Sequence, residues 1–159
     1  DRPLPIGFNQ TISQPYIVAK MCQLLKLTGQ ERVLDIGAGS GYQAAILSLL
    51  GKEVIAIERI EELAKIADAR LKRLGFDNVK VIVGDGSRGV MDEAPFDAIK
   101  CAAATAVISP AWIEQLKDGG RIVLPLQKTW YQDLVRITKV GGELQEESFG
   151  SVVFVPLIT

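Results

Sequence analysis

The chain has 159 residues, 48% of them hydrophobic, which is enough for one domain with a substantial apolar core. Its 18 basic and 19 acidic residues give a formal net charge of −1, which disfavours a protein that binds nucleic acid through the phosphate backbone. The absence of histidine excludes Ser-His-Asp and Cys-His catalysis, and with only two cysteines few ligands are left for a zinc or haem site.

The first 25 residues predict a loop followed by a helix. Residues 1–10 contain two prolines and a glycine without any periodicity, so we expect a loop there. Apolar residues then recur at helical spacing through 16–25. Pro15 suits the first turn of this helix, and the hydroxyl of Ser13 is placed to cap it. From the pattern alone, a helix cap is the simpler interpretation of Ser13.

Segment 33–42, Val-Leu-Asp-Ile-Gly-Ala-Gly-Ser-Gly-Tyr, predicts a buried strand that runs into a tight glycine turn before a helix over 43–50. Glycines allow backbone angles that a Cβ disfavours, and they let a ligand approach the bare backbone beside the helix N-terminus. Glu58 ends a second strand over 54–57, where a carboxylate can accept hydrogen bonds from a ribose. Together these features indicate a pocket for a nucleoside cofactor.

Tyr42 stands where the dinucleotide-binding fingerprint has its third glycine. This departure favours a cofactor without a pyrophosphate, and we expect S-adenosylmethionine. Its sulfonium leaving group departs neutral, so the protein needs mainly to align donor and acceptor, which suits a chain without histidine. The alternatives are a glycine turn that holds no ligand and a dehydrogenase, and Tyr42 argues against the second.

The next elements predict further residues at the same edge of the sheet. A helix is expected over 60–74 and a third strand over 79–83. This strand delivers Asp85 beside Gly37 and Glu58, where it can accept a hydrogen bond from an adenine amine or serve only as a turn residue. A fourth strand over 95–104 runs into small residues that leave room for a substrate.

The remaining residues complete an α/β domain. We expect a short helix over 110–116, a turn at 117–120, a fifth strand over 121–126, and two strands over 130–140 and 148–158. Gly141-Gly142 is too short a connection for anything but an antiparallel pair. The sequence therefore predicts a doubly wound, mostly parallel seven-stranded sheet with an antiparallel end and about four helices.

Several motifs together resemble the protein-L-isoaspartate O-methyltransferase family, and the Thr-Ile-Ser-Gln-Pro segment at 11–15 is the most specific of them. The resemblance covers nearly all of the chain and implies one Rossmann-like class I methyltransferase domain over 1–159. Family members usually carry a helical segment before the position of Asp1, so the chain resembles a member cut short at its start. The motifs are Pro5-Ile6-Gly7, Gln10 to Pro15, 33–42, Ile57-Glu58-Arg59, Gly84-Asp85-Gly86, Ala94 to Ile99, Leu116 to Gly120, and Phe154 to Leu157.

The resemblance implies methyl transfer from S-adenosylmethionine to the free carboxylate of an L-isoaspartyl residue in a damaged protein, with S-adenosyl-L-homocysteine as the product. It makes Ser13 the active-site serine and assigns the ribose to Glu58, the adenine to Asp85 and Gly86, and the methionine end to 37–40. The implied cofactor-binding residues are Thr11, Ile12, Gly37, Ala38, Gly39, Ser40, Glu58, Arg59, Asp85 and Gly86, and the implied substrate-binding residues are Ile6, Phe8, Ser13 and Ala103.

Two pairs of residues depart from the family pattern and bear on substrate preference. Phe8-Asn9 stand where many bacterial relatives have a polar residue and then glycine, and Lys100-Cys101 stand where Val-Thr is common. A lysine is unusual in a central strand, because such strands are buried on both faces. Lys100 is expected to end the strand, to point at the substrate carboxylate, or to mark a diverged member.

The expected setting is a cytoplasmic monomer that acts on isoaspartyl proteins and peptides, without nucleic acid or membrane. The sequence has neither an apolar run near eighteen residues nor a basic-then-apolar leader, and we expect Cys22 and Cys101 to be buried thiols rather than a disulfide. Two alternatives stay open: a small-molecule methyltransferase of the same fold and a non-catalytic binding module.

Overall fold

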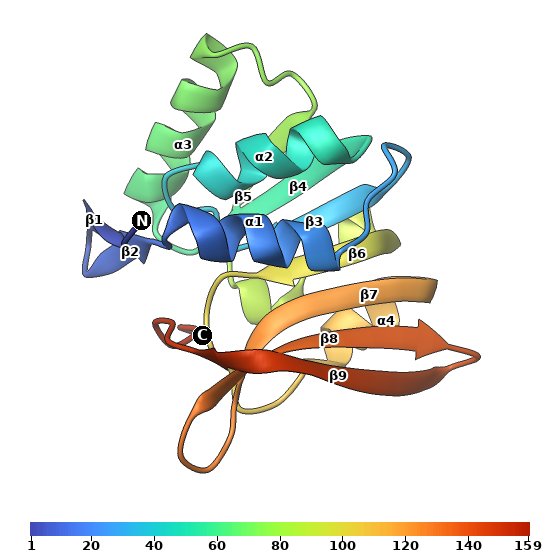
Figure 1. Ribbon diagram of the computed structural model, residues 1–159. Helices are drawn as coiled ribbons and strands as arrows, with labels where there is room; N and C mark the ends of the chain where they lie inside the picture. Colours follow the sequence, from blue (N-terminus) through green and yellow to red (C-terminus); the bar gives the residue numbers. More distant parts are fainter.

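A seven-stranded sheet with helices on both faces forms the body of the protein, and a two-stranded hairpin lies beside it (Figure 1). The computed structural model describes residues 1–159. The seven strands and four α-helices agree with the predicted architecture. The elements are β1 Leu4–Gly7, β2 Gln10–Ile12, α1 Pro15–Leu24, β3 Arg32–Ile36, α2 Tyr42–Leu50, β4 Glu53–Glu58, α3 Glu61–Arg73, β5 Val79–Val83, η1 Gly86–Arg88, η2 Met91–Glu93, β6 Phe96–Cys101, α4 Pro110–Gln115, β7 Leu116–Gln127, β8 Gln132–Val140 and β9 Glu143–Val152.

The strand order in the sheet is β5-β4-β3-β6-β7-β8-β9. Strands β3 to β7 pair in parallel, and β8 pairs antiparallel with both β7 and β9. The chain fills the sheet outward from β3 on one side and then from β6 on the other. The strand order therefore reverses its direction between β3 and β6. In such a sheet a crevice opens beyond the carboxyl ends of these two strands, and this places the candidate site there.

The central strands are apolar on both faces because each face is covered. Val33 and Ala98 point to the side that packs against α1 and α2, whereas the next residues, Leu34 and Ile99, pack on the side of α4 and its buried Trp112. This alternation explains the nearly continuous apolar runs that marked these strands in the sequence. None of the helices is long and apolar enough to cross a membrane. Both cysteines are buried free thiols, as expected.

The prediction of a loop over residues 1–10 is wrong, because β1 and β2 form an antiparallel hairpin in which Leu4 lies opposite Ile12. The two turn residues, Phe8 and Asn9, have φ angles of 54° and 57°. Two positive φ angles in succession are typical of a tight hairpin turn, which usually contains Asn-Gly. A bulky residue such as phenylalanine seldom adopts this conformation, so the sequence did not signal the turn.

The second half of the sheet differs from prediction at three points. The fourth strand ends at Cys101 instead of continuing to residue 104. Residues 117–120 form an irregularity inside β7, since Phe96 and Ala98 of β6 pair with Leu116 and Arg121. The last strand is β9, not 148–158, because a two-residue turn lets pairing resume at once, with Val140 opposite Glu143.

Candidate active site

The glycine turn between β3 and α2 forms the floor of the site. Gly37, Gly39 and Gly41 have φ angles of 86°, 52° and 85°, which explains why glycine occupies all three positions. Gly41 is the N-cap of α2. A Cβ on Gly39 would lie 3.1 Å from Cδ1 of Ile6, so the β1–β2 hairpin rests directly over the turn.

Glu58 ends β4 and faces the glycine turn. It is 8% exposed, and its Oε2 accepts a hydrogen bond of 2.9 Å from the Gly39 N–H while its Oε1 accepts one of 3.0 Å from the Ile60 N–H. Two carboxylate oxygens offer about four acceptor positions, so two of them stay available. Glu58 therefore fixes the turn and still has capacity for hydroxyl groups of a ligand.

Asp85 and Gly86 follow β5 at the same edge of the sheet. Oδ1 of Asp85 accepts hydrogen bonds from the N–H and the hydroxyl of Ser87, at 2.9 and 2.7 Å, and so caps η1. These bonds hold the pKa of Asp85 below its ordinary value. The structure thus gives Asp85 the role of a turn residue, and its contact with adenine stays a prediction. A Cβ on Gly86 would lie only 2.5 Å from Cγ2 of Ile36, so this backbone requires glycine.

Ser13 does not cap α1, and that prediction is wrong. The N-cap is Gln14, and it makes no side-chain capping bond. Oδ1 of Asp1 accepts a hydrogen bond of 3.1 Å from the Tyr16 N–H in the first turn of the helix. The hydroxyl of Ser13 is therefore not used for capping.

Three adjoining hollows line this edge of the sheet. The first lies over Glu58, Gly37, Gly39 and Gly86, and the second, of about 380 Å³, lies between Ser13 and the chain around Phe154. The third lies against the glycine turn and shares lining residues with both of the others. Thr11 and Ala102 line all three, and Ser13 lines the second and the third. The hollows therefore form one cleft, and Ser13 lies where its second and third parts meet.

Most of the predicted site residues come together in this cleft. Those that line it are Ile6, Thr11, Ile12, Ser13, Gly37, Ala38, Gly39, Ser40, Glu58, Arg59, Gly86 and Ala103. Asp85 and Phe8 do not line it. Phe8 lies at the exposed tip of the β1–β2 hairpin, and its contact with a substrate stays a prediction.

The C-terminal segment belongs to the site, although the sequence pattern did not indicate this. Residues 155–158 line the first hollow, where Ala104 donates to the Val155 carbonyl and Leu157 donates to the Ala104 carbonyl, each at 2.8 Å. Pro156 could have indicated that residues 155–158 do not continue the last strand, because proline cannot donate a hydrogen bond between strands and is rare within a paired strand. Gln10, Gln43 and Ala102 also line the cleft without having been predicted to bind a ligand.

Lys100 lies fully buried beneath the cleft rather than within it. It is the neighbour of Asp35 across the β3–β6 pair, and its Nζ donates a hydrogen bond to Oε1 of Gln43. Burial lowers the pKa of Lys100 and raises that of Asp35 to about 6, although each opposes the shift of the other. Lys100 thus points toward α2, and the expectation that it faces a substrate carboxylate is wrong.

Comparison with known proteins identifies similar sequences. The family described as protein-L-isoaspartate(D-aspartate) O-methyltransferase matches residues 1–159. A protein-L-isoaspartate O-methyltransferase 2 of Shewanella sediminis is 53% identical over 99% of this chain, and the chain spans only 65% of that relative. A protein-L-isoaspartate O-methyltransferase of Methanoculleus marisnigri is 49% identical over 99% of this chain and 72% of its own length.

Solved structures extend the comparison to the fold. One protein-L-isoaspartate O-methyltransferase superposes with a TM-score of 0.89 at 29% identity, over 98% of this chain and 51% of its own. A Plasmodium falciparum structure described as a beta-aspartate methyltransferase superposes with a TM-score of 0.83 at 28% identity, over 99% of this chain and 80% of its own. That structure is a complex with S-adenosyl-L-homocysteine.

Proposed function

Because the chain belongs to the protein-L-isoaspartate(D-aspartate) O-methyltransferase family, we propose that it methylates the free carboxylate of L-isoaspartyl residues in damaged proteins, with S-adenosylmethionine as donor. The observation that carries the proposal is the position of Ser13. Its side chain lies between the hollow at the glycine turn and an open hollow large enough for part of a peptide. The relatives from Shewanella sediminis and Methanoculleus marisnigri are named for O-methylation of protein L-isoaspartate.

The residues of the cleft fit this cofactor. The free acceptor positions of Glu58 suit the ribose hydroxyls, and the bare backbone at Gly37 and Gly39 lets the methionine end approach the N-terminus of α2. Gly86 lines the hollow on the side assigned to adenine. When bound, the cofactor supplies a methyl group on a positively charged sulfur.

The acceptor needs little activation by the protein. A carboxylate is already ionised at neutral pH, so the transfer requires no general base, in keeping with a chain that contains no histidine. One carboxylate oxygen forms the new O–CH₃ bond, the S–CH₃ bond breaks, and S-adenosyl-L-homocysteine leaves. We infer that Ser13 donates a hydrogen bond to the other oxygen and so orients the nucleophile without itself attacking. Without the enzyme, the backbone amide nitrogen of the next residue then attacks the ester carbonyl and expels methanol, which closes a succinimide.

The proposal is tested with labelled S-adenosylmethionine and two peptides that differ only in carrying isoaspartate or aspartate. We expect base-labile methyl ester on the isoaspartyl peptide alone. Cofactor binding without label on either peptide would overturn the proposal and favour a small-molecule acceptor or a non-catalytic module. Label on both peptides would overturn the selectivity for isoaspartate.

The role of Ser13 is tested by the Ser13→Ala variant. We expect turnover of the isoaspartyl peptide to fall about tenfold to a hundredfold, as one charge-assisted hydrogen bond predicts, while cofactor affinity stays unchanged. Ser48→Ala is the matched control, because Ser48 is buried in α2 and its hydroxyl donates to the Ala45 carbonyl. Full turnover of Ser13→Ala would refute the positioning role.

We further propose that the chain acts as a cytoplasmic monomer, without nucleic acid or a membrane as partner. The two free buried thiols suit a reducing compartment, and a net charge of −1 gives no attraction to anionic polymers. Sedimentation of the purified chain tests the oligomeric state.

A further inference from the structure

A chain of three buried polar side chains lies between the sheet and α2. Lys100 of β6 and Asp35 of β3 are fully buried, and Gln43 of α2 is 8% exposed. Nζ of Lys100 donates to Oε1 of Gln43, and Nε2 of Gln43 donates to Oδ1 of Asp35. Two buried charges that are joined only through an amide are expensive to keep, so their presence calls for a reason.

The two charged neighbours fix the orientation of the Gln43 amide. A lysine ammonium can only donate hydrogen bonds, and an ionised carboxylate can only accept them. The amide oxygen must therefore face Lys100 while the amide nitrogen faces Asp35. An amide has two N–H groups and two acceptor positions, so one donor and one acceptor of Gln43 stay available.

Gln43 also reaches the cleft. It lines the third hollow together with Ser13 and the glycine turn, and it lies in the first turn of α2 next to Tyr42. A single side chain thus connects the buried charges to the hollow assigned to the methionine end of the cofactor. That end carries an ammonium and a carboxylate, which are the partners that a free acceptor and a free donor of an amide would take.

We propose that Lys100 is a positioning residue that holds the Gln43 amide against the amino-acid tail of S-adenosylmethionine. The inference rests on the proposed function, because it concerns the same cofactor. Lys100 acts through Gln43, since it is fully buried and lines none of the hollows.

Two ligands distinguish positioning from a merely structural role. S-adenosyl-L-homocysteine has the amino-acid tail, whereas 5′-methylthioadenosine has the nucleoside and the thioether without the tail. We expect Lys100→Met to raise the Kd for S-adenosyl-L-homocysteine about tenfold and to leave the Kd for 5′-methylthioadenosine within about twofold, since the loss concerns hydrogen bonds to the tail alone. Equal weakening of both ligands, or no change for either, would overturn the proposal.

Removing one of two opposite buried charges leaves the other uncompensated and can prevent folding, so a second variant is needed. Asp35→Asn/Lys100→Met removes both charges together and keeps an acceptor for the Gln43 amide. We expect this folded variant to show the same selective loss for the tailed ligand. If it instead binds both ligands as the parent does, Lys100 has no positioning role.

A double-mutant cycle shows whether Gln43 transmits the effect. Gln43→Met should itself weaken S-adenosyl-L-homocysteine selectively, and adding the charge-free pair Asp35→Asn/Lys100→Met to it should cause little further loss. Additive losses would contradict transmission through Gln43. Failure of the parent chain to bind S-adenosyl-L-homocysteine would instead refute the proposed cofactor, so the two failures are distinguishable.

Discussion

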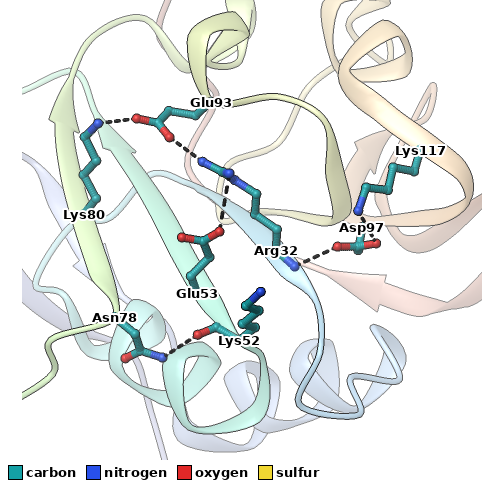
Figure 2. Close-up of polar contacts among 8 residues, drawn as sticks. All are labelled: Arg32, Lys52, Glu53, Asn78, Lys80, Glu93, Asp97 and Lys117. Atoms are coloured by element: carbon teal, nitrogen blue, oxygen red, sulfur yellow. Dashed lines mark hydrogen bonds and ion pairs between the residues drawn. The ribbon is translucent and has the colours of Figure 1, made fainter.

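The two ends of the parallel strands differ in how their polar groups are used. At the amino ends, charged side chains bind one another: Arg32 pairs with Glu53 at 3.4 Å and with Glu93, and Lys80 also pairs with Glu93 (Figure 2). Asp97 accepts hydrogen bonds there from the Arg32 backbone N–H at 2.8 Å and from Lys117 at 3.0 Å. At the carboxyl ends, Glu58 accepts hydrogen bonds only from backbone N–H groups beside a cleft.

The difference separates stability from ligand binding within the same strands. Glu53 begins β4 and Glu58 ends it, so two glutamates five residues apart have opposite roles. The charges at the amino ends compensate one another and tie the starts of β3, β4 and β5 together. At the carboxyl ends, hydrogen-bonding capacity and bare glycine backbone stay available, as a binding site requires.

Glu58→Ala should produce the largest effect on ligand affinity. The change removes the acceptor for the Gly39 and Ile60 N–H groups as well as the expected ribose contacts. Because hydrogen bonds to charged groups contribute about 1.5–3 kcal/mol each, we expect the Kd for S-adenosyl-L-homocysteine to rise about a hundredfold by calorimetry. Glu53→Ala is the control from the other end of β4. An equal rise in Kd for Glu53→Ala would show that the two ends of the strand do not differ in ligand binding.

Gly86→Ala should destabilise the carboxyl end of the sheet. Its Cβ would lie 2.5 Å from Cγ2 of Ile36, which is buried in the core and cannot withdraw. We expect a loss of about 2 kcal/mol in the free energy of unfolding, measured with urea, together with weaker cofactor binding. Gly84→Ala is the milder comparison, because its Cβ would meet the end of the Ile57 side chain at 3.2 Å. Equal losses would show that the close approach at Gly86 is unimportant.

The pH dependence of stability should have opposite signs at Asp35 and Glu93. Burial raises the pKa of Asp35 from 3.8 to about 6. Ionisation of Asp35 therefore lowers the free energy of unfolding above pH 6, and this loss becomes smaller as the pH falls toward 3.8. We expect Asp35 to make the protein about 1 kcal/mol more stable at pH 5 than at pH 7. Asp35→Asn should lack this gain in the free energy of unfolding when urea unfolding is measured at pH 5 and at pH 7.

Glu93 supplies the comparison at the amino end. The hydrogen bond from Lys80 holds the pKa of Glu93 below 4.5, so its stabilising effect is present above pH 4.5 and is lost as the pH falls through the lowered pKa. Glu93→Gln should therefore flatten the acid side of the stability curve without changing the interval between pH 5 and 7. A change in the pH dependence of stability between pH 5 and 7 would contradict the assignment of the acid-side effect to Glu93.

Asp97→Ala should lower stability modestly and should leave ligand binding unchanged. The variant removes the acceptor of the Arg32 N–H, which predicts a loss of about 1 kcal/mol in the free energy of unfolding. The Kd for S-adenosyl-L-homocysteine should stay within about twofold of the parent value. A larger change would mean that the two ends of the strands are coupled.

The sequence predicted the parts of the molecule that local pattern determines. The apolar strand before Gly37, the glycine turn and Glu58 all follow from composition and spacing, and the structure brings them together. The local pattern around Ser13 wrongly indicated a helix cap. The N–H of Tyr16 in the first turn of the helix instead donates to Oδ1 of Asp1, fifteen residues earlier in the chain. The partners of Lys100 lie in two other elements, so only the folded arrangement reveals them.

An NMR titration of the labelled protein with S-adenosyl-L-homocysteine tests most directly whether the cofactor binds at the carboxyl ends of the strands. We expect the largest amide shifts at Thr11, Gly37, Gly39, Glu58 and Gly86, and almost none at Arg32, Glu53, Lys80 and Asp97. That result would locate the cofactor at the carboxyl ends of the strands. Shifts centred on the amino ends, or none at saturating ligand, would contradict the assignment of this cleft.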